Sequence, residues 1–353
     1  MGSIRLGWWN LQNLFDADDD PISADLEFTT AKGWTPEVYA AKLANLAVAV
    51  NELHDGQGPE LLGVCEVEGD AVFQALLDEI GNPHLKLVSD PTRTSDLRGI
   101  DTSVAYDDRK LEPVDQRSHV VHLRYATRDI FEVVFELVET GERLVVIATH
   151  WPSRSKGRWR SEPLRIAVAE NIAWIVRDHV RFDAERYLEL KAAGDLAAVQ
   201  ERWETKVLIM GDLNDEPSDR SLIEHLQASS ELDRVTGPTN AIKEFRPEAI
   251  DYRGDDCFVY NASWKFLTPE NTGTYFIDST DDEVFANRYQ VLDQIIATRG
   301  LLDPAGLHLD VGSVRIHDTK TVATQPAKRP RGFDRKTKKG TSDHLPVTAL
   351  LAY

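Results

Sequence analysis

The spacing of apolar residues predicts both buried strands and amphipathic helices in the first third of the chain. Residues 4–9 and 61–65 are short apolar runs, which predict buried strands. Between them a helix is predicted to begin at Thr35 and Pro36, an N-cap followed by proline at the first helical position. A second helix follows the second strand and passes through Phe73. Strands and helices therefore alternate in this part of the chain.

The middle of the chain is rich in strands and leads into a long helix. Runs of β-branched residues between turn signals predict strands at residues 102–106, 118–123, 130–138 and 144–149. Helices are predicted from about Ser161 to beyond Val180 and over residues 185–204. Shorter strands are predicted at residues 206–210, 291–298, 310–316 and 345–351. This order favours sheets with helices packed outside them. Without a linker or repeat to divide the chain, one domain over residues 1–353 is expected.

Polar side chains stand where the buried strands are predicted to end. These side chains are Asn10, Glu66, His150, Asp212 with Asn214, and Asp343 with His344. Strand ends on a rigid scaffold are places where functional sites are built. Taken singly, an Asp-His pair or an Asn after a strand is more often a cap or a turn. The prediction of a functional site therefore depends on all of these residues occurring together at strand ends.

The sequence lacks several motifs of well-known enzyme classes. It has no phosphate-binding loop and no GxGxxG, HExxH or GxSxG segment. These absences count against nucleotide-driven transfer, Rossmann redox chemistry and serine hydrolysis. What remains is a set of oxygen ligands that suits Mg²⁺ or Mn²⁺ better than zinc, namely Glu66, Asp212, Asp343, Asn10 and Asn214. Two histidines join this set: His150 can donate to a phosphate oxygen, and His344 can act as an acid or a base.

The charge of the chain restricts how an anionic substrate could bind. The formal net charge is -19, and a charge of this sign spread evenly would repel nucleic acid and other polyanions. Residues 154–165 and 326–340, however, together hold twelve of the 40 Lys and Arg residues. The first segment follows His150 and the second precedes Asp343, so both are expected to flank one cleft. A Lys-rich segment alone is more often a solvated loop, and only this adjacency favours substrate contact.

The cysteines and the amino terminus bear on the compartment. Two cysteines, Cys65 and Cys257, cannot form a disulfide framework or a cysteine-based zinc site. The first residues lack the apolar run of a signal peptide, and no run of about 18 apolar residues predicts a membrane span. A cytoplasmic location is expected for the chain as it stands, with a removed secretory leader as the alternative.

Seven segments, taken in order, resemble the endonuclease/exonuclease/phosphatase superfamily. The segments are WNLQNLFD (9–16), CEVE (65–68), RGIDT (98–102), HWPSR (150–154), GDLNDEP (211–217), LDQII (292–296) and SDHLPV (342–347). The resemblance spans residues 4–351, and the branch that it is most similar to is bacterial and nuclease-like. It implies a four-layer α/β/β/α sandwich, in which two face-to-face mixed sheets are flanked by helices.

The resemblance also implies a metal site. Glu66 is expected to be the principal carboxylate on a Mg²⁺ or Mn²⁺ ion, with Asn10 and Asp343 near it. Asp212 is expected to orient or deprotonate the attacking water. Asp293 is expected to orient His344, and whether Asp212 or His344 is the base stays open.

The remaining roles concern the phosphoryl group. Asn214 and His150 are expected to donate to its oxygens in the transition state, and Arg98 and Arg154 are expected to contact phosphate. In-line attack on a phosphodiester needs a poised water and positive charge on the non-bridging oxygens, so these roles agree with the chemistry.

Three functions compete at this point. The favoured one is a metal-dependent phosphodiesterase or nuclease that acts on nucleic acid. The alternative is a small-molecule or lipid-headgroup phosphoesterase, of the phosphoinositide or sphingomyelin type, on the same core. A binding protein on an inactive scaffold is disfavoured, because no motif position is lost. DNA or RNA, endo or exo cleavage, the number of metal ions and the oligomeric state are left open.

Overall fold

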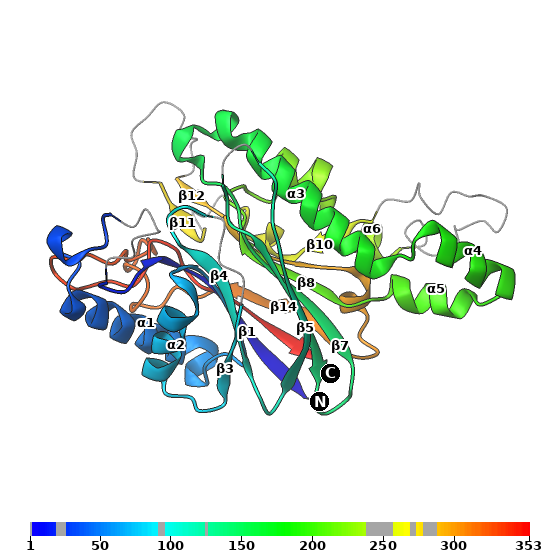
Figure 1. Cartoon of the computed structure of the whole chain (residues 1–353), viewed down its shortest axis with the longest axis horizontal. Coiled ribbons are helices and arrows are strands. Elements are labelled where there is room, and N and C mark those ends of the chain that lie inside the picture. The colour runs from blue at the N-terminus through cyan, green and yellow to red at the C-terminus, as the bar shows by residue number, and fades with distance from the viewer. Residues whose placement is uncertain are drawn as a thin grey trace.

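Two β-sheets lie face to face in the middle of the molecule, and helices cover their outer faces (Figure 1). The computed structural model describes residues 2–18, 26–90, 96–123, 126–237, 257–268, 273–277 and 288–353. This arrangement is the predicted four-layer α/β/β/α sandwich.

The first sheet joins the beginning and the end of the chain. Within the described ranges its strands are β1 (Ser3–Leu14), β2 (Leu61–Val67), β3 (Leu85–Val88), β4 (Asp101–Asp107), β14 (His308–Ile316) and β15 (Val347–Ala352), in the order β14-β15-β1-β2-β4-β3. β1 runs parallel to β2 and antiparallel to β15. Ser3 is therefore paired with Ala352, and β15 lies between β1 and β14.

The second sheet brings three polar strand ends to one edge. Its described strands are β5 (Leu111–His119), β6 (Ile130–Leu137), β7 (Arg143–His150), β8 (Val207–Asp212), β9 (Ala228–Ser229), β10 (Val259–Asn261) and β13 (Asp293–Ala297), in the order β5-β6-β7-β8-β13-β10-β9. β7 and β8 are parallel, so His150 pairs with Asp212. β13 is antiparallel to β8, so Asp293 pairs with Asp212 from the other side.

Helices and short elements complete the described chain. The helices are α1 (Pro36–Gly56), α2 (Gly69–Ile80), α3 (Arg158–Val180), α4 (Ala184–Ala193), α5 (Leu196–Trp203) and α6 (Leu232–Thr236). Short helical turns lie at Thr30–Lys32, Arg154–Lys156, Ser221–His225, Ala262–Phe266 and Arg299–Leu302. A separate hairpin joins β11 (Tyr275–Phe276) and β12 (Tyr289–Gln290). In the described part of the molecule, no helix has both the length and the apolar character that crossing a membrane requires.

Apolar side chains fill the three spaces between the four layers. Because successive side chains of a strand point to opposite faces, Trp8 enters the core between the sheets and Trp9 packs under α1 and α2. Ile172 of α3 packs on the outer face of the second sheet. A Cβ atom at Gly63 would lie 2.5 Å from the side chain of Met210, so glycine allows the two sheets to approach there.

Most predicted elements are confirmed within a few residues, two predictions differ, and the strand β3 was not predicted. The strand predicted at 118–123 is wrong: β5 ends at His119, and as an edge strand it has exposed apolar positions that blur the pattern. The single helix predicted over 185–204 is two helices, because Gly194 adopts a left-handed conformation (φ 73°) and ends α4. β3 has only four residues, too few for a periodic signal.

Candidate active site

Polar side chains from both sheets meet at the edge where β1, β2, β7 and β8 end. One atom, Oδ2 of Asp212, lies at their centre. Asn10 Nδ2 donates to it across 2.9 Å, His150 Nε2 lies 3.5 Å away, and His344 Nε2 lies 3.8 Å away. The other oxygen of Asp212 accepts from the backbone N–H of Asn214 at 3.0 Å. Residues from four parts of the sequence therefore surround one carboxylate.

The environment of Asp212 shifts its protonation. The side chain is buried, and burial raises its pKa from the ordinary 3.8 to about 6. The positive charge of His344 and the hydrogen bond from Asn10 act in the opposite direction and limit the rise. Asp212 is thus ionised at neutral pH but close enough to titration to take up a proton.

His344 is held by a carboxylate on its other face. Its Nδ1 donates to Oδ2 of Asp293 across 2.7 Å, and Trp8 Nε1 donates to the second oxygen of Asp293 at 3.0 Å. Burial alone would lower the pKa of His344, but the charges of Asp293 and Asp212 outweigh it and raise that pKa well above its ordinary value. These two carboxylates therefore favour the protonated form of His344.

The pKa of His150 is shifted in the opposite direction to that of His344. Burial lowers its pKa well below the ordinary value, and the charges of Arg128 and Arg98 add to the effect. Its Nε2 lies 3.8 Å from Oε1 of Glu66, and its buried Nδ1 has no hydrogen-bond partner among the described residues. A neutral imidazole in this position offers one donor and one acceptor to a bound molecule.

An irregular turn presents Glu66 to the same cavity. The register of β1 against β2 shifts after Asn10, and Glu66 adopts a left-handed backbone conformation (φ 61°). Its Oε2 accepts from the backbone N–H of Asn13 at 2.8 Å. Burial raises the pKa of Asp343, and the negative charge of Glu66 adds to that rise, whereas His344 lowers it. A bound cation would relieve this unfavourable effect on the charged form of Asp343.

The donor chemistry fits a hard divalent cation. Glu66, Asp343 and Asn10 offer oxygen atoms, the ligands that Mg²⁺ and Mn²⁺ prefer. Ligand atoms of Cys65, His150 and Asp212 also lie within 4.8 Å of one another. Burial, however, raises the pKa of the Cys65 thiol well above its ordinary value, so this sulfur stays protonated and does not favour a thiolate-bound metal.

Asn214 lies in the loop that follows β8, and Arg154 lies in the turn between β7 and α3, against that loop. Asn214 has a left-handed backbone (φ 49°), and its Nδ2 donates to the carbonyl of Trp151 at 3.1 Å. Arg154 Nε donates to the carbonyl of Asn214, and its Nη2 lies 3.0 Å from Asp215 and 2.6 Å from Asp219. The guanidinium that the sequence assigned to phosphate thus binds the protein's own loop.

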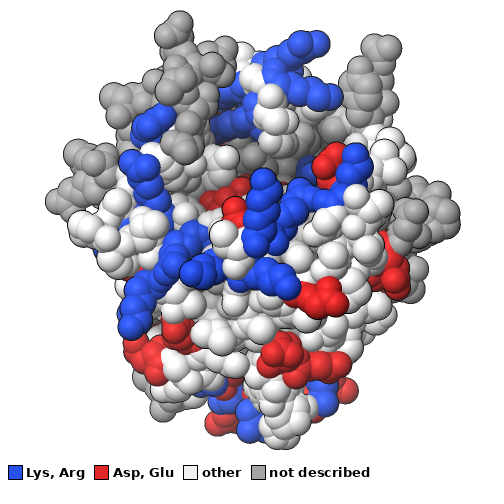
Figure 2. Space-filling model, turned by 90° about the vertical axis from the view of Figure 1, so that its left-hand side faces the viewer, with Lys and Arg blue, Asp and Glu red and all other residues white. Residues whose placement is uncertain are grey.

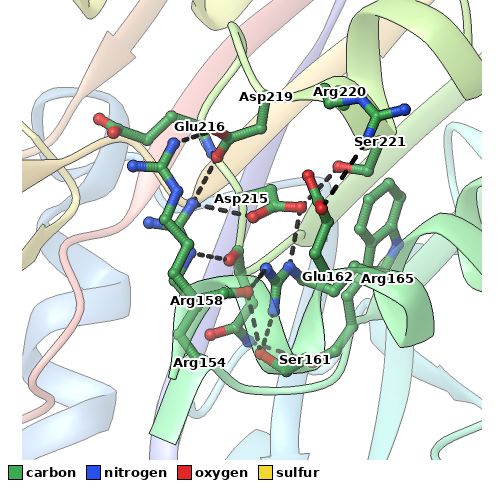
Figure 3. Close-up of polar contacts among 12 residues, drawn as sticks. Arg154, Arg158, Ser161, Glu162, Arg165, Asp215, Glu216, Asp219, Arg220 and Ser221 are labelled. Atoms are coloured by element: carbon green, nitrogen blue, oxygen red, sulfur yellow. Dashed lines mark hydrogen bonds and ion pairs between the residues drawn. The ribbon is translucent and has the colours of Figure 1, made fainter. Parts of the chain in front are cut away.

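Further ion pairs extend this loop contact (Figure 3). Arg158 pairs with Asp219, and the fully buried Arg165 lies 2.8 Å from the second oxygen of Asp215. Ser221 donates to the same oxygen at 2.6 Å. The three arginines come from the start of α3 and the turn before it, so the network fixes this turn against the loop that carries Asn214.

Three side chains at the site were missed by sequence reasoning. Arg128 is buried and pairs with Asp96 at 3.0 Å, and the ring of Tyr275 packs at a tilt against His344, with ring centroids 4.9 Å apart. Neither lies in a motif. Lys42 is 1% exposed on the inner face of α1. Its spacing from Tyr39 in the apolar stripe was a signal that could have found it, because a charge on that face must be buried.

Basic side chains surround the site. Arg98, which was expected to contact phosphate, is partly exposed, and its charge acts on His150. The segment 326–340 contacts the end of β1, where the backbone N–H of Phe333 donates to Gln12 Oε1 at 2.7 Å. Figure 2 looks onto this face and shows Lys and Arg side chains gathered around a hollow that has acidic side chains in its floor. Positive charge is therefore concentrated on this face, although Arg154, Arg158 and Arg165 of the first basic segment are paired with carboxylates.

Comparison with known proteins identifies the family. The model of the endonuclease/exonuclease/phosphatase family matches residues 5–280, most of the chain. The chain belongs to this family. Phosphoric ester hydrolysis, with dependence on a divalent metal, is typical of endonuclease/exonuclease/phosphatase proteins, which agrees with the chemistry of the donor set. Among proteins with curated descriptions, none matches the chain.

Solved structures share the fold at low sequence identity. An endonuclease/exonuclease/phosphatase protein from Bacteroides vulgatus is 14% identical with a TM-score of 0.53, covering 100% of this chain and 99% of its own. TDP2 from D. rerio, complexed with a single strand DNA product, is 11% identical with a TM-score of 0.54 and full coverage of both chains. A mannosyl-6-phosphatase from Bacteroides thetaiotaomicron is 13% identical with a TM-score of 0.51, covering 99% of this chain and 100% of its own. At such identities the likeness shows the fold alone.

Proposed function

We propose that the chain is a divalent-metal-dependent phosphodiesterase that hydrolyses nucleic acid by attack of an activated water. The observation that carries this proposal is the position of Asp212 Oδ2, within 3.8 Å of the side-chain nitrogens of Asn10, His150 and His344. A water beside that oxygen would have a base next to it and polar donors around it.

The directions of the pKa shifts support Asp212 as the base and His344 as the acid. Asp212 is ionised at neutral pH and can accept a proton from water. His344 already carries its proton, so it acts as a donor to a phosphoryl or leaving oxygen rather than as the base. Asp293 is the positioning residue that keeps His344 charged and oriented.

The remaining residues receive the phosphate. Glu66 and Asp343, with Asn10 beside them, would hold Mg²⁺ or Mn²⁺, which when bound supplies Lewis acidity and neutralises phosphate charge. Neutral His150 can donate to a non-bridging oxygen, and the amide of Asn214 has a second N–H besides the one given to Trp151. Arg98 is exposed enough to reach an adjacent phosphate, whereas we assign Arg154 to loop positioning.

The choice of nucleic acid rests on the charge around the site. A band of Lys and Arg side chains beside the hollow suits a substrate with several phosphates better than one with a single phosphate (Figure 2). The shared fold includes both TDP2 with a DNA product and a mannosyl-6-phosphatase, so the fold by itself does not select the substrate.

The test is cleavage of labelled single- and double-stranded oligonucleotides with Mg²⁺ or Mn²⁺, alongside a screen for phosphate release from monoesters. Cleavage that needs the metal and is lost in Asp212→Asn is expected. Release of free phosphate from small esters, with the oligonucleotides left intact, would overturn the nucleic acid assignment and favour the small-molecule alternative.

A further inference from the structure

Lys42 is a basic side chain enclosed next to the proposed cation ligands, and burial lowers its pKa from 10.5 to about 7. It lies on α1 and is 1% exposed. Its Nζ donates to the backbone carbonyl of Gln12 and, at 3.2 Å, to that of Asn13. The rings of Trp34 and Phe333 have their centroids 5.6 and 5.5 Å from Nζ. Burying a protonated amine is unfavourable unless such partners replace the water that it loses. These contacts therefore hold the Lys42 amine at this position.

The two carbonyls that Lys42 binds belong to a strained turn. Gln12 and Asn13 both have left-handed backbones, with φ of 52° and 56°. This conformation is unfavourable for an L-residue other than glycine, and here two such residues are adjacent. The register shift between β1 and β2 falls at the same residues, so the turn is a bulge that changes the direction of side chains.

The backbone of that turn orients two residues of the proposed site. The N–H of Gln12 donates to Asn10 Oδ1 at 2.9 Å, and the N–H of Asn13 donates to Glu66 Oε2 at 2.8 Å. Asn10 in turn donates to Asp212 at 2.9 Å. A continuous series of contacts therefore leads from the Lys42 ammonium through the turn to Asn10 and Glu66.

We propose that Lys42 is a positioning residue whose ammonium fixes the left-handed turn at Gln12 and Asn13, so that Glu66 and Asn10 are held in place to bind a divalent cation. The cation itself rests on the proposed function. The direction in which metal affinity changes when Lys42 is replaced tests this positioning role. A nearby positive charge repels a divalent cation, so loss of charge alone would tighten metal binding, whereas loss of positioning weakens it.

The experiment is calorimetric titration of the metal-free protein with Mn²⁺. In Lys42→Met, which keeps the length of the side chain without its charge, the dissociation constant is expected to rise about tenfold or more. Lys265→Met is the matched control, because Lys265 also donates to a carbonyl, that of Val311 at 2.9 Å, and lies 5.7 Å from the ring centroid of Phe266. The control is expected to bind Mn²⁺ like the wild type.

A second substitution tests whether Lys42 acts on metal binding through the turn at Gln12 and Asn13. Glycine adopts positive φ without strain and keeps the N–H that holds Glu66, so adding Asn13→Gly to Lys42→Met should recover part of the lost affinity. Should Lys42→Met not fold, Lys42→Gln retains a donor without the charge and is expected to weaken binding at least about threefold. A folded variant that binds Mn²⁺ as tightly as the wild type, or more tightly, overturns the proposal. Because binding is measured without turnover, a wild type that binds Mn²⁺ but cleaves nothing contradicts the proposed function alone.

Discussion

The imidazole of His344 and the carboxylate of Asp293 are joined by a 2.7 Å hydrogen bond in a part of the site closed to solvent. We expect Asp293→Asn to lower kcat by about 10²-fold or more, because a neutral amide does not stabilise the charged imidazole. KM should change little. Steady-state kinetics on an oligonucleotide measure this, with the exposed Asp303→Asn as control. A kcat within threefold of the wild type would show that His344 does not depend on Asp293.

The pH dependence of the reaction should report Asp212. Burial raises the pKa of this carboxyl from 3.8 to about 6, so it is protonated below about pH 6 and ionised above it. A protonated carboxyl takes no proton from water, and kcat/KM should therefore fall as the pH is lowered through about 6. The pKa of His344 is raised, so loss of its proton should affect only the alkaline side. A profile that stays flat across pH 6 would rule out Asp212 as the base.

Arg154 should contribute more to stability than to substrate affinity. It binds the carbonyl of Asn214 and pairs with Asp215 and Asp219, which are largely buried. Arg154→Met leaves each carboxylate with one arginine partner in place of two and should reduce the free energy of unfolding by about 2 kcal/mol. Urea denaturation measures this loss, and the exposed Arg160→Met in the same segment is the control. If Arg154→Met left the stability unchanged but raised KM, Arg154 would be assigned to phosphate binding instead.

Glu132 should make stability depend on acid pH at a place remote from the site. Burial would raise its pKa, but hydrogen bonds from His119 at 2.8 Å and His179 at 2.9 Å outweigh burial and lower that pKa from 4.5 to about 2. The stabilisation is therefore full above about pH 4.5 and is lost as the pH falls through about 2.

The corresponding substitution is Glu132→Gln, which should cost about 2 to 3 kcal/mol at neutral pH. The difference from the wild type should shrink below about pH 4.5, as thermal or urea unfolding across pH would reveal. Glu136→Gln, on the same strand but 42% exposed, is the control. A cost that stays constant down to about pH 2 would contradict the lowered pKa.

The basic segment 326–340 should increase the affinity for extended substrates only. Lys336 and Lys339 are exposed on the segment beside the site. Changing both to glutamine should raise KM for an oligonucleotide roughly fivefold at low salt and weaken its salt dependence, with no effect on a small phosphodiester. The control removes two charges from α4, Arg186 and Lys191, at the opposite end of the molecule from this face (Figure 1). Equal effects on both substrates would argue against phosphate contacts along a polymer.

The positions of the main site residues could be predicted from the sequence, because polar residues coincide with the ends of the predicted strands. The parallel pairing of β7 and β8 places His150 opposite Asp212, and both were predicted from apolar runs that end in a polar residue. Arg128 was not predictable in this way, since its partner Asp96 lies in another loop and no local pattern links them. Arg154 was assigned to phosphate because a sequence does not reveal which carboxylates a guanidinium will meet.

The place of β15 between β1 and β14 has a consequence for biosynthesis. A ribosome makes β15 after every other strand of the sandwich, together with Asp343 and His344 just before it. Until then β1 and β14 lack the strand that pairs with both, and backbone N–H and C=O groups along their edges are unpaired. A nascent chain therefore lacks both the strand that closes the first sheet and two residues of the proposed site, so closure of the sheet and completion of that site are expected to coincide.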